Sequence, residues 1–396
     1  MNRQQLWTIV SVCDLILSFA ERVMETGAFE QFFGELEDPR QSAKVAHLFT
    51  DILFLVVCAS IAGAKGWEDI EDFGDLHFDW FAAKGLFKNG LPVHDTIARV
   101  ISRIDSGQFQ RCFIGWMQSV VELSEGKLIA IDGKRLCGSY NRENRQSAIH
   151  MVNAFASENN VVLGQIKTQS KSNEITAIPA LLTMLDIKGC LISIDAMGCQ
   201  KEIAEQIIDG GGDYLLALKG NQKELHDAVR KALSGAINQE VICLEKAHGR
   251  SEARAYHVME AGSLTDNFCE WKELKTIGVA LSYRQTKQGK ESLEYRYYIS
   301  SAKLSKARFA NAVRSHWAVE NSLHWVLDVS MKEDECQIYR GNAADILSGA
   351  RKLALNMLRA ETTRKVSIPR KQKRAHGSTE YLEQVLTAGL GKLSEN

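Results

Sequence analysis

Residues 128–134 read LIAIDGK, and residues 190–197 read CLISIDAM. Each is an aliphatic run that closes on an aspartate followed by a small residue, a pattern typical of a buried strand that ends in a turn. The two aspartates are Asp132 and Asp195. Carboxylates at the edge of a core are costly unless they are paired, and on neighbouring strands they repel each other. We therefore expect a divalent metal ion to lie between them.

A third carboxylate lies in a helical pattern further along the chain. Apolar residues recur there at helical spacing, and Glu320 occupies the middle of the stripe, where a leucine would be expected. The stripe consists of Phe309, Val313, Trp317, Glu320, His324 and Leu327. Two aspartates and an inward-facing glutamate predict an oxygen-rich site suited to Mg²⁺ or Mn²⁺. Asp328 lies near the same face and is the strongest rival to Glu320 as the third ligand.

The bulk composition is that of an ordinary globular protein, with 396 residues, 45% hydrophobic residues and 24% charged residues. The net charge of −1 excludes a protein that binds nucleic acid through overall basicity. Any contact with DNA must therefore come from local basic patches.

The nine cysteines are scattered and form no CxxC pair, which argues against a disulfide framework and a zinc site. Reduced cysteines suit a cytoplasmic protein. The apolar run 53–64 is too short to span a bilayer and predicts a buried helix. The N-terminal run 6–20 is interrupted by Asp14 and predicts no signal peptide. We expect a cytoplasmic location and no membrane partner.

Changes in hydrophobic pattern divide the chain into segments. Residues 1–125 predict a helical domain, a candidate for DNA binding because the loop 85–92 joins two helices, although most such pairs simply pack. Residues 126–222 and 301–360 predict an α/β domain. Its expected order is three strands, helix, strand, helix, strand, which is typical of a mixed sheet flanked by helices. The corresponding ranges are 127–132, 148–157, 160–168, 174–186, 190–195, 199–209 and 213–218.

Two further segments differ in character. Residues 223–300 open with a helical pattern and then alternate, which predicts a β-rich insertion. Residues 361–396 predict a basic, polar C-terminal tail. Within it, residues 364–374 hold six basic side chains and no acid, which indicates either a solvated segment or non-specific contact with phosphates.

Several strings together resemble a known family. The chain is similar to the insertion-sequence DDE transposases of the ISAs type, the group that includes the H-repeat-associated proteins, over roughly residues 25–360. The strings that carry the resemblance are LPVHDT (91–96), IAIDGK (129–134), KSNEITAIPALL (171–182), IDAMGCQKEIA (194–204), GDYLLALKGNQ (212–222), HGRSEAR (248–254), RSHWAVENSLHWVLDV (314–329) and EDEC (333–336).

The resemblance implies a ribonuclease-H-like catalytic domain with a β-rich insertion before the last catalytic helix. It also implies that Asp132, Asp195 and Glu320 are the catalytic, metal-binding acids. Related transposases often carry arginine four residues before the glutamate and lysine seven after it. This chain has His316 and Leu327 there. His316 retains a donor for a phosphate, whereas Leu327 has none.

The expected reaction is metal-dependent cleavage of phosphodiesters and strand transfer at the ends of an insertion sequence. Two ions of Mg²⁺ or Mn²⁺ activate the attacking hydroxyl and neutralise the leaving oxygen without a side-chain base. In the assignment of roles, Asp132 bridges both ions, Asp195 holds one and Glu320 holds the other.

Other residues have both a functional and a simpler structural interpretation. Candidates for DNA contact, whose alternative is an exposed side chain or a surface ion pair, are Lys134, Lys219, Asn221, His248, Arg250, Arg254 and His316. Three residues are expected to support the site. His324 lies one helical turn beyond Glu320 and orients it, Trp317 is interpreted as a core anchor, and Asp328 is the alternative acid.

Three functions remain open at this point. The leading one is a DNA transposase that works as a homo-oligomer, with a dimer on DNA expected because two element ends must be handled together. Its partners would be the double-stranded terminal inverted repeats and the target DNA of a bacterial nucleoid. A hydrolytic nuclease of the same fold is the alternative, since the acids do not distinguish water from a 3′ hydroxyl. A catalytically silent DNA-binding remnant is the third.

Overall fold

The computed structural model describes residues 27–41, 45–121, 126–139, 149–168, 174–235, 243–247, 250–285 and 290–390, of which the side chains at Gly138 and 243–252 are not described. The chain divides into two units. One contains residues 1–122, 136–149 and 325–396, and the other contains residues 123–135 and 150–324. The second unit carries the acids that the sequence singles out, so its architecture is given first.

A single mixed sheet forms the centre of the second unit. Within the described residues it has the order β3-β2-β1-β4-β5-β9-β8-β7-β6. Its first five strands are β1 (Leu128–Arg135), β2 (His150–Ala156), β3 (Val161–Thr168), β4 (Leu191–Ile194) and β5 (Asp213–Leu218). The strands β1, β2 and β3 pair antiparallel, whereas β4 lies parallel to both β1 and β5. This is the ribonuclease-H-like arrangement expected from the sequence.

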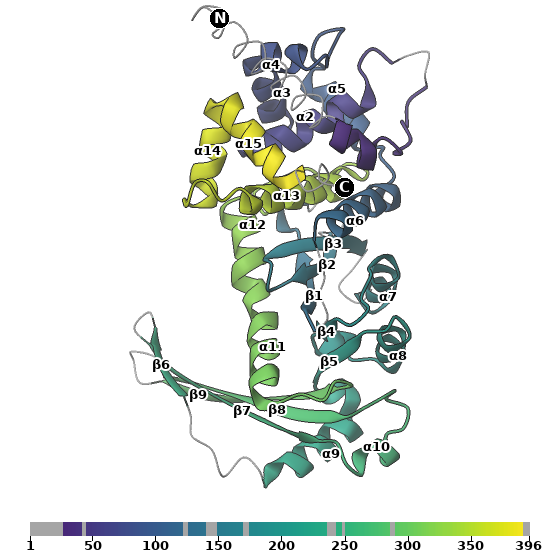
Figure 1. Ribbon diagram of the computed structural model, residues 1–396, viewed down its shortest axis with the longest axis vertical. Coiled ribbons are helices and arrows are strands. Elements are labelled where there is room, and N and C mark those ends of the chain that lie inside the picture. The colour runs from purple at the N-terminus through teal and green to yellow at the C-terminus, as the bar shows by residue number, and fades with distance from the viewer. Residues whose placement is uncertain are drawn as a thin grey trace, which may run out of the picture. The chain divides into compact units, whose positions relative to one another are not determined.

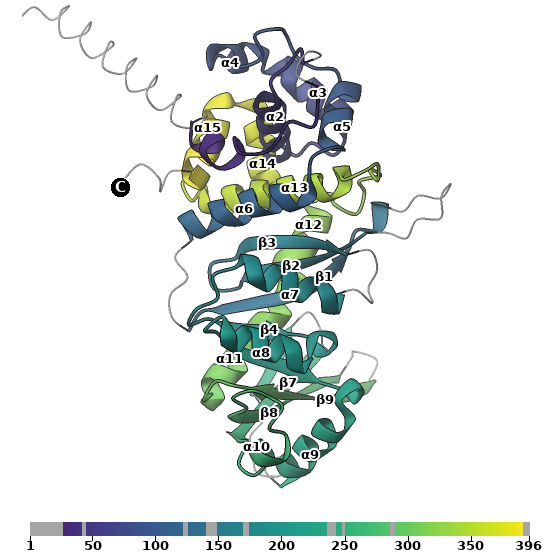
Figure 2. The same ribbon diagram turned by 90° about the vertical axis from the view of Figure 1, so that its right-hand side faces the viewer.

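Helices cover both faces of these strands. Helices α7 (Glu174–Met184) and α8 (Lys201–Asp209) lie on one face, and α11 (Lys306–Val319) crosses the other (Figures 1 and 2). Successive side chains of β1 point to opposite faces of the sheet, and Leu128 packs in a cluster with residues of α11. Asp132, four residues further along the same strand, therefore faces α11 as well.

The segment after β5 extends this sheet. Helix α9 (Lys223–Ser234) is followed by β6 (Cys243–Ala247), β7 (Arg250–Glu260), α10 (Leu264–Asn267), β8 (Thr276–Gln285) and β9 (Glu291–Ser300). The last strand, β9, pairs antiparallel with β5 and with β8. The predicted insertion is therefore β-rich, and it continues the central sheet because β9 pairs with the edge of β5.

Helix α11 is anchored at the junction between the first five strands and the strands of the insertion. Phe309 and Val313 of α11 are buried in one cluster with Leu191 of β4 and Tyr298 of β9. The rings of Tyr298 and Phe309 lie 5.5 Å apart in an edge-on contact. The insertion thereby fixes the helix that leads into Glu320.

Gly278 on β8 makes this anchoring possible. A Cβ atom at this position would lie 2.6 Å from the Phe309 ring, closer than any normal contact. We expect Gly278→Ala to destabilise the protein by about 1–3 kcal/mol, the usual cost of overpacking a core. Urea denaturation measures the effect.

Gly115→Ala is the matched control for this substitution. Gly115 lies inside a helix, and a Cβ there meets nothing within 4 Å. Alanine should raise stability by roughly 0.5–1 kcal/mol at such a position. Equal urea midpoints for the two variants would show that the Gly278–Phe309 packing is unimportant.

The first unit is helical and discontinuous in sequence. Besides the helical residues 27–33, it contains the short helix η2 (Cys137–Ser139) and α2 (Phe49–Ala62), α3 (Trp67–Leu76), α4 (Phe78–Ala83), α5 (His94–Ile101), α6 (Ser106–Val120), α12 (Trp325–Val329), α13 (Ala343–Ala360), α14 (Ile368–Gly377) and α15 (Thr379–Leu390). Helix α13 is buried along nearly its whole length and packs against α2, α6 and α15. The N-terminal and C-terminal thirds of the chain therefore share one core.

Two of the predicted domain boundaries differ from this arrangement. The second unit ends at His324, not near 360, and α13 belongs to the helical unit. The prediction of a polar tail over residues 361–396 is wrong for the described part, which forms α14 and α15. Hydrophobic side chains of α15 such as Leu382 and Leu386 are buried. Lys371 of α14 is buried against the Glu361 carboxylate. The basic composition of this segment therefore did not indicate that it forms a packed helix pair.

Among the described residues, no single helix combines the length and apolar character needed to cross a membrane. Helices α2 and α3 meet those criteria only when taken together, and they are bent by 95° relative to each other.

Candidate active site

The two aspartates lie at equivalent positions on neighbouring parallel strands. Ile131 of β1 is in register with Ile194 of β4, so Asp132 and Asp195 are the next residues on each strand. Strand β4 ends at Ile194, one residue before the predicted end at Asp195. Strand β1, however, continues to Arg135, so the prediction that it closes at Asp132 is wrong.

Backbone amides orient both carboxylates. The Gly133 N–H lies 2.9 Å from Oδ1 of Asp132, which accepts its hydrogen bond. Oδ1 of Asp195 accepts hydrogen bonds from the N–H groups of Met197 and Gly198, at 3.0 and 3.4 Å, and so caps the short helix η4 (Ala196–Gly198). Each aspartate keeps its second oxygen available for a ligand.

Glu320 begins a π-helical turn. Helix α11 ends at Val319, and residues Glu320–His324 form the π-helical segment η7, a local widening that is frequent at functional sites. Nδ1 of His324 lies 3.7 Å from Oε2 of Glu320 and 3.7 Å from Oδ2 of Asp132. One ligand atom from each of these three residues lies within 4.8 Å of the other two, close enough to hold one metal ion.

The carboxylates interact electrostatically. Burial raises the pKa of Asp132 to about 7, and the negative charges of Asp195 and Glu320 add to the shift. A carboxyl group surrounded in this way retains its proton near neutral pH unless a cation neutralises the cluster. The donor set, three carboxylates with one imidazole, fits a hard divalent cation.

A cavity of about 280 Å³ opens beside the acids. Asp132, Asp195 and Glu320 all contribute to its walls, together with groups from β5, α9, β9 and α11. These further lining residues include Lys219, His226, Glu294, Tyr295, Arg296, Tyr298, His316 and Trp317. The three acids predicted from separate parts of the sequence therefore surround one space.

Strand β9 braces the helix turn that precedes Glu320. The guanidinium of Arg296 lies over the Trp317 ring, 3.4 Å from its centroid, and is held by two hydrogen bonds to Glu294. The Trp317 indole N–H donates to the Tyr298 hydroxyl at 3.4 Å. The interpretation of Trp317 as a core anchor is wrong, because its side chain is 44% exposed and forms part of the cavity wall.

We expect Arg296→Ala to reduce DNA cleavage by about tenfold, the lower range for losing an outer-shell support of a metal ligand. Trp317 lies three residues before Glu320, and without the guanidinium its side chain loses its stacking partner. Stability should fall by about 1–2 kcal/mol, as for a partly buried cation–π pair. Initial cleavage rates give the result.

Arg230→Ala is the control for that change, since Arg230 is an exposed arginine of α9, likewise paired with an acid, that does not line the cavity. Equal cleavage rates for the two variants would mean that β9 has no role in positioning the glutamate.

Two of the DNA-contact candidates lie in the loop after β5. Lys219 is exposed and lines the cavity with the acids. The Asn221 side-chain amide instead donates to the Ala196 carbonyl at 2.7 Å. It therefore ties this loop to the turn that carries Asp195, a positioning role that the sequence did not indicate.

Two other candidates are less exposed than expected. His316 lines the cavity, with Nδ1 2.9 Å from the Ser193 hydroxyl, and burial lowers its pKa to about 4. It is therefore a neutral imidazole at pH 7. Lys134 is buried in β1, with only 6% of its surface exposed, so neither a phosphate contact nor a freely exposed ammonium suits its position.

Of the remaining DNA-contact candidates, only Arg254 has a described side chain, and it does not line this cavity. Arg254 lies on β7 and is half-buried. Arg250 begins the same strand, but its side chain lies outside the described residues, as does the whole of His248. Asp328 lies on α12 in the first unit, whereas Glu320 belongs to the unit that holds both aspartates.

The sequence reasoning missed a fourth acid beside the site. Glu174, at the start of α7, is buried, and its Oε1 would lie 2.5 Å from a Cβ atom at Gly133. His150 Nδ1 lies 3.8 Å from the same oxygen. A side chain at Gly133 would displace the Glu174 carboxylate, so the glycine that follows Asp132 allows this close approach inside the strand. Its signal in the sequence is the pair Asp-Gly inside an otherwise aliphatic strand.

Comparisons with known proteins match nearly the whole chain. The profile of the family described as "Transposase DDE domain" matches residues 121–357, and the one described as "DDE_Tnp_1-associated" matches residues 30–117. A "Putative transposase YncI" of Escherichia coli O157:H7 is 51% identical over 368 residues, which cover 90% of this chain and 94% of that protein. An "H repeat-associated putative transposase YhhI" of Escherichia coli K12 is 49% identical over 377 residues, covering 93% of this chain and all of that protein.

Two further matches differ in kind. An "Inactive transposase YbfQ" of Escherichia coli K12 is 61% identical over 66 residues, covering 17% of this chain and 79% of that protein. Among solved structures, a synaptic complex of piggyBac transposase with hairpin DNA aligns with a TM-score of 0.42 at 10% identity, covering 96% of this chain and 79% of that one. That likeness is too weak to bear on function.

Proposed function

Because the chain belongs to the family of DDE transposases, we propose that it cleaves DNA at the ends of an insertion sequence and joins those ends to a target. The observation that carries this proposal is the meeting of Asp132, Asp195 and Glu320 at one cavity. A transposase of this family uses divalent metal, and the donor set at the cavity fits one.

The proposed metal ligands are the three acids. Asp132 would help to hold both ions, and Asp195 and Glu320 would each help to hold one. Two ions of Mg²⁺ or Mn²⁺, when bound, activate the attacking hydroxyl and stabilise the charge that develops on the leaving oxygen. His324 lies close enough to Asp132 and Glu320 to orient both carboxylates, or to replace Asp195 as a ligand of one ion.

Residues in and beside the cavity bind the substrate or position the acids. The exposed ammonium of Lys219 is the cation we assign to a phosphate beside the scissile bond. The amide of Asn221 holds the turn of Asp195 through the Ala196 carbonyl. His316 fixes α11 to β4 through Ser193 without adding a charge. Each of these groups acts before the chemical step by setting the geometry of the acids or of the DNA.

A hydrolytic nuclease is the alternative function, since the same acids serve water as the nucleophile. A silent DNA-binding remnant is a third, and a relative named as inactive gives it a specific basis. The large helical unit and the β-rich insertion favour a transposase, because a simple nuclease needs neither.

One assay separates the three functions. The purified chain is incubated with Mg²⁺ and labelled duplexes that carry the inverted repeats flanking its gene. A transposase gives cut and joined products, a nuclease gives cut products alone, and a remnant gives a mobility shift without cleavage. A homo-oligomer, with a dimer on paired ends of nucleoid DNA, is the assembly we expect, and sizing of the DNA complex by light scattering measures it.

A further inference from the structure

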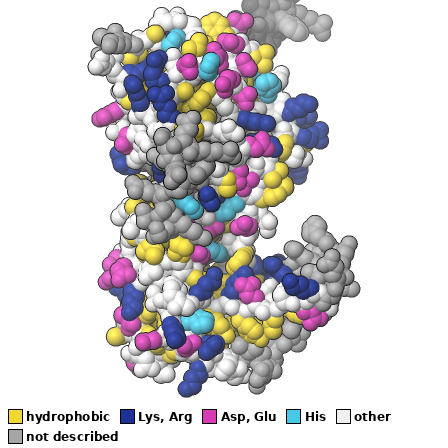
Figure 3. Space-filling model, turned by 180° about the vertical axis from the view of Figure 1, so that it is seen from behind, with side chains coloured by type: hydrophobic (Ala, Val, Ile, Leu, Met, Phe, Trp, Pro, Cys, Tyr) yellow, Lys and Arg dark blue, Asp and Glu magenta, His cyan; other side chains and the backbone are white. Residues whose placement is uncertain are grey.

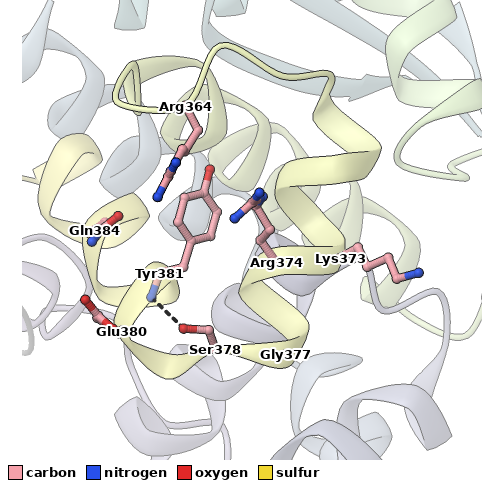
Figure 4. Close-up of a pocket in the computed structure, with 8 residues that line it drawn as sticks. All are labelled: Arg364, Lys373, Arg374, Gly377, Ser378, Glu380, Tyr381 and Gln384. Atoms are coloured by element: carbon pink, nitrogen blue, oxygen red, sulfur yellow. Dashed lines mark hydrogen bonds between the residues drawn. The ribbon is translucent and has the colours of Figure 1, made fainter.

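The helix pair α14–α15 encloses a second cavity, of about 380 Å³, in the first unit. Both family profiles end before it, at residues 117 and 357. Its lining comes from the segment after α13, from α14 and from the first turns of α15 (Figure 4). The lining residues are Arg364, Lys373, Arg374, Gly377, Ser378, Glu380, Tyr381 and Gln384.

Positive charge dominates this cavity. Three of its lining residues are cations and one is an acid. Arg364 and Arg374 approach the Tyr381 ring from different segments, whereas the Lys373 side chain extends away from the centre (Figure 4). Figure 3 shows Lys and Arg side chains gathered over α14. Two guanidinium groups that face one space repel each other unless an anion lies between them.

Glu361, an acid outside the lining, is already engaged. Oε2 of Glu361 accepts a hydrogen bond from the Tyr381 hydroxyl at 2.7 Å and lies 3.3 Å from the Lys371 ammonium. Although burial opposes ionisation, hydrogen bonds from two hydroxyls and this ammonium lower the pKa of Glu361 to about 2. Lys371 therefore neutralises Glu361. The ion pairs formed within the described part of the chain include none with the side chains of Arg364, Lys373 or Arg374.

The start of α15 adds hydrogen-bond donors. This helix has 12 residues, and its first turn borders the cavity through Ser378 and Glu380. The Ser378 hydroxyl accepts from the Tyr381 N–H at 3.2 Å, and the first amides of a helix have no partner within the helix. Amides at a helix N-terminus, combined with two guanidinium groups, form an arrangement suited to phosphate.

We propose that the cavity between α14 and α15 binds a backbone phosphate of duplex DNA, through Arg364 and Arg374. A polymeric anion fits better than a free phosphate because the basic surface continues beyond the cavity. Lys365, Arg370 and Lys373 are all exposed within the same short segment. The proposal rests on the proposed function for the identity of the DNA, but it assigns a contact outside the catalytic unit.

The test is a salt titration of DNA binding by the full-length chain. Wild type and Arg364→Gln/Arg374→Gln are compared on a duplex of the terminal repeat, with EDTA present, by fluorescence anisotropy between 50 and 300 mM KCl. Each phosphate contact contributes about 0.9 to the slope of log K against log salt, so the variant should lose about one to two from that slope. Its Kd near 100 mM salt should rise by about tenfold or more.

A matched pair controls for the change in net charge. Lys188 and Lys201 are exposed on the second unit and line neither cavity, so Lys188→Gln/Lys201→Gln should keep the wild-type slope. Since the arginines are exposed, unchanged circular dichroism and melting temperature are expected for the pocket variant. A second arm measures whether inorganic phosphate raises the melting temperature of the wild type and not of the pocket variant.

The outcomes separate the pocket from the proposed function. Loss of slope in the pocket variant alone supports the DNA contact. Equal slopes for the wild type and both variants overturn it, and if phosphate then stabilises only the wild type, the ligand is a free phosphate. Failure of the wild type to bind any duplex overturns the proposed function as well as the pocket.

Discussion

Replacing Asp132, Asp195 or Glu320 with alanine should abolish DNA cleavage and leave the fold intact. A thousandfold loss corresponds to about 4 kcal/mol of transition-state stabilisation, and removing a ligand of the catalytic metal should cost at least that much. Duplex binding in EDTA should stay within about threefold of wild type, because contacts to the backbone provide most of the affinity. Single-turnover cleavage of a labelled terminal duplex measures the first effect, and anisotropy measures the second.

Asp328→Asn is the informative comparison for this prediction. It removes the charge of the alternative acid, which lies on α12 in the other unit. Cleavage should persist in this variant. Cleavage that survives Glu320→Ala but disappears in Asp328→Asn would show that the third ligand was assigned to the wrong residue, and full activity of Asp132→Ala would exclude the site altogether.

Asp132→Asn should stabilise the metal-free protein, increasingly as the pH rises. The pKa of Asp132 is raised to about 7 by burial and by the charges of Asp195 and Glu320, whereas its ordinary value is 3.8. The folded state therefore binds a proton more tightly than the unfolded state, and wild-type stability falls as pH rises from about 4 to 7. Asparagine removes this loss, so its advantage should be about 1–3 kcal/mol larger at pH 8 than at pH 5.

Denaturation in EDTA at the two pH values measures this advantage. Asp266→Asn, at an exposed acid on α10, is the control for the loss of a negative charge. Added Mg²⁺ should stabilise the wild type more at pH 8 than at pH 6, since the metal competes with the proton on Asp132. Parallel pH curves for the wild type and Asp132→Asn would mean that neither burial nor the neighbouring carboxylates raise the pKa of Asp132.

The catalytic sheet could be predicted from the sequence because its strands are short aliphatic runs with clear ends. The ranges 160–168 and 213–218 match β3 and β5 to within a residue. The parallel strands β4 and β5, which are buried within the sheet, give this continuous apolar signal, and helix α8 between them has a strong amphipathic pattern. The same signal placed Asp132 and Asp195 at adjacent strand positions.

Glu320 was singled out in the sequence because it was expected to face inward, and the structure corrects that expectation. Its position in an apolar stripe predicted an inward-facing acid, but its side chain is 77% exposed. The stripe changes its surroundings along its length, since Phe309 and Val313 face the core whereas Trp317 and Glu320 face the cavity. A periodic pattern does not distinguish a core from the wall of a binding site.

Features that depend on distant packing could not be predicted. The bracing of Trp317 by Arg296 requires knowing that β9 lies beside β5, more than 70 residues away in sequence. The contact of Glu174 with Gly133 depends in the same way on how α7 covers β1. Helix α14 was mistaken for a tail because its buried lysine pairs with Glu361, a residue outside the helix.

Crystals of the protein grown or soaked with Mn²⁺, and measured for anomalous scattering at the manganese edge, test the metal site most directly. Bound manganese is expected between the carboxylate oxygens of Asp132, Asp195 and Glu320, and its signal should disappear in Glu320→Ala. Manganese bound elsewhere while these three carboxylates carry none, at pH 8 and millimolar metal, would contradict the assignment of this chain as a metal-dependent transposase.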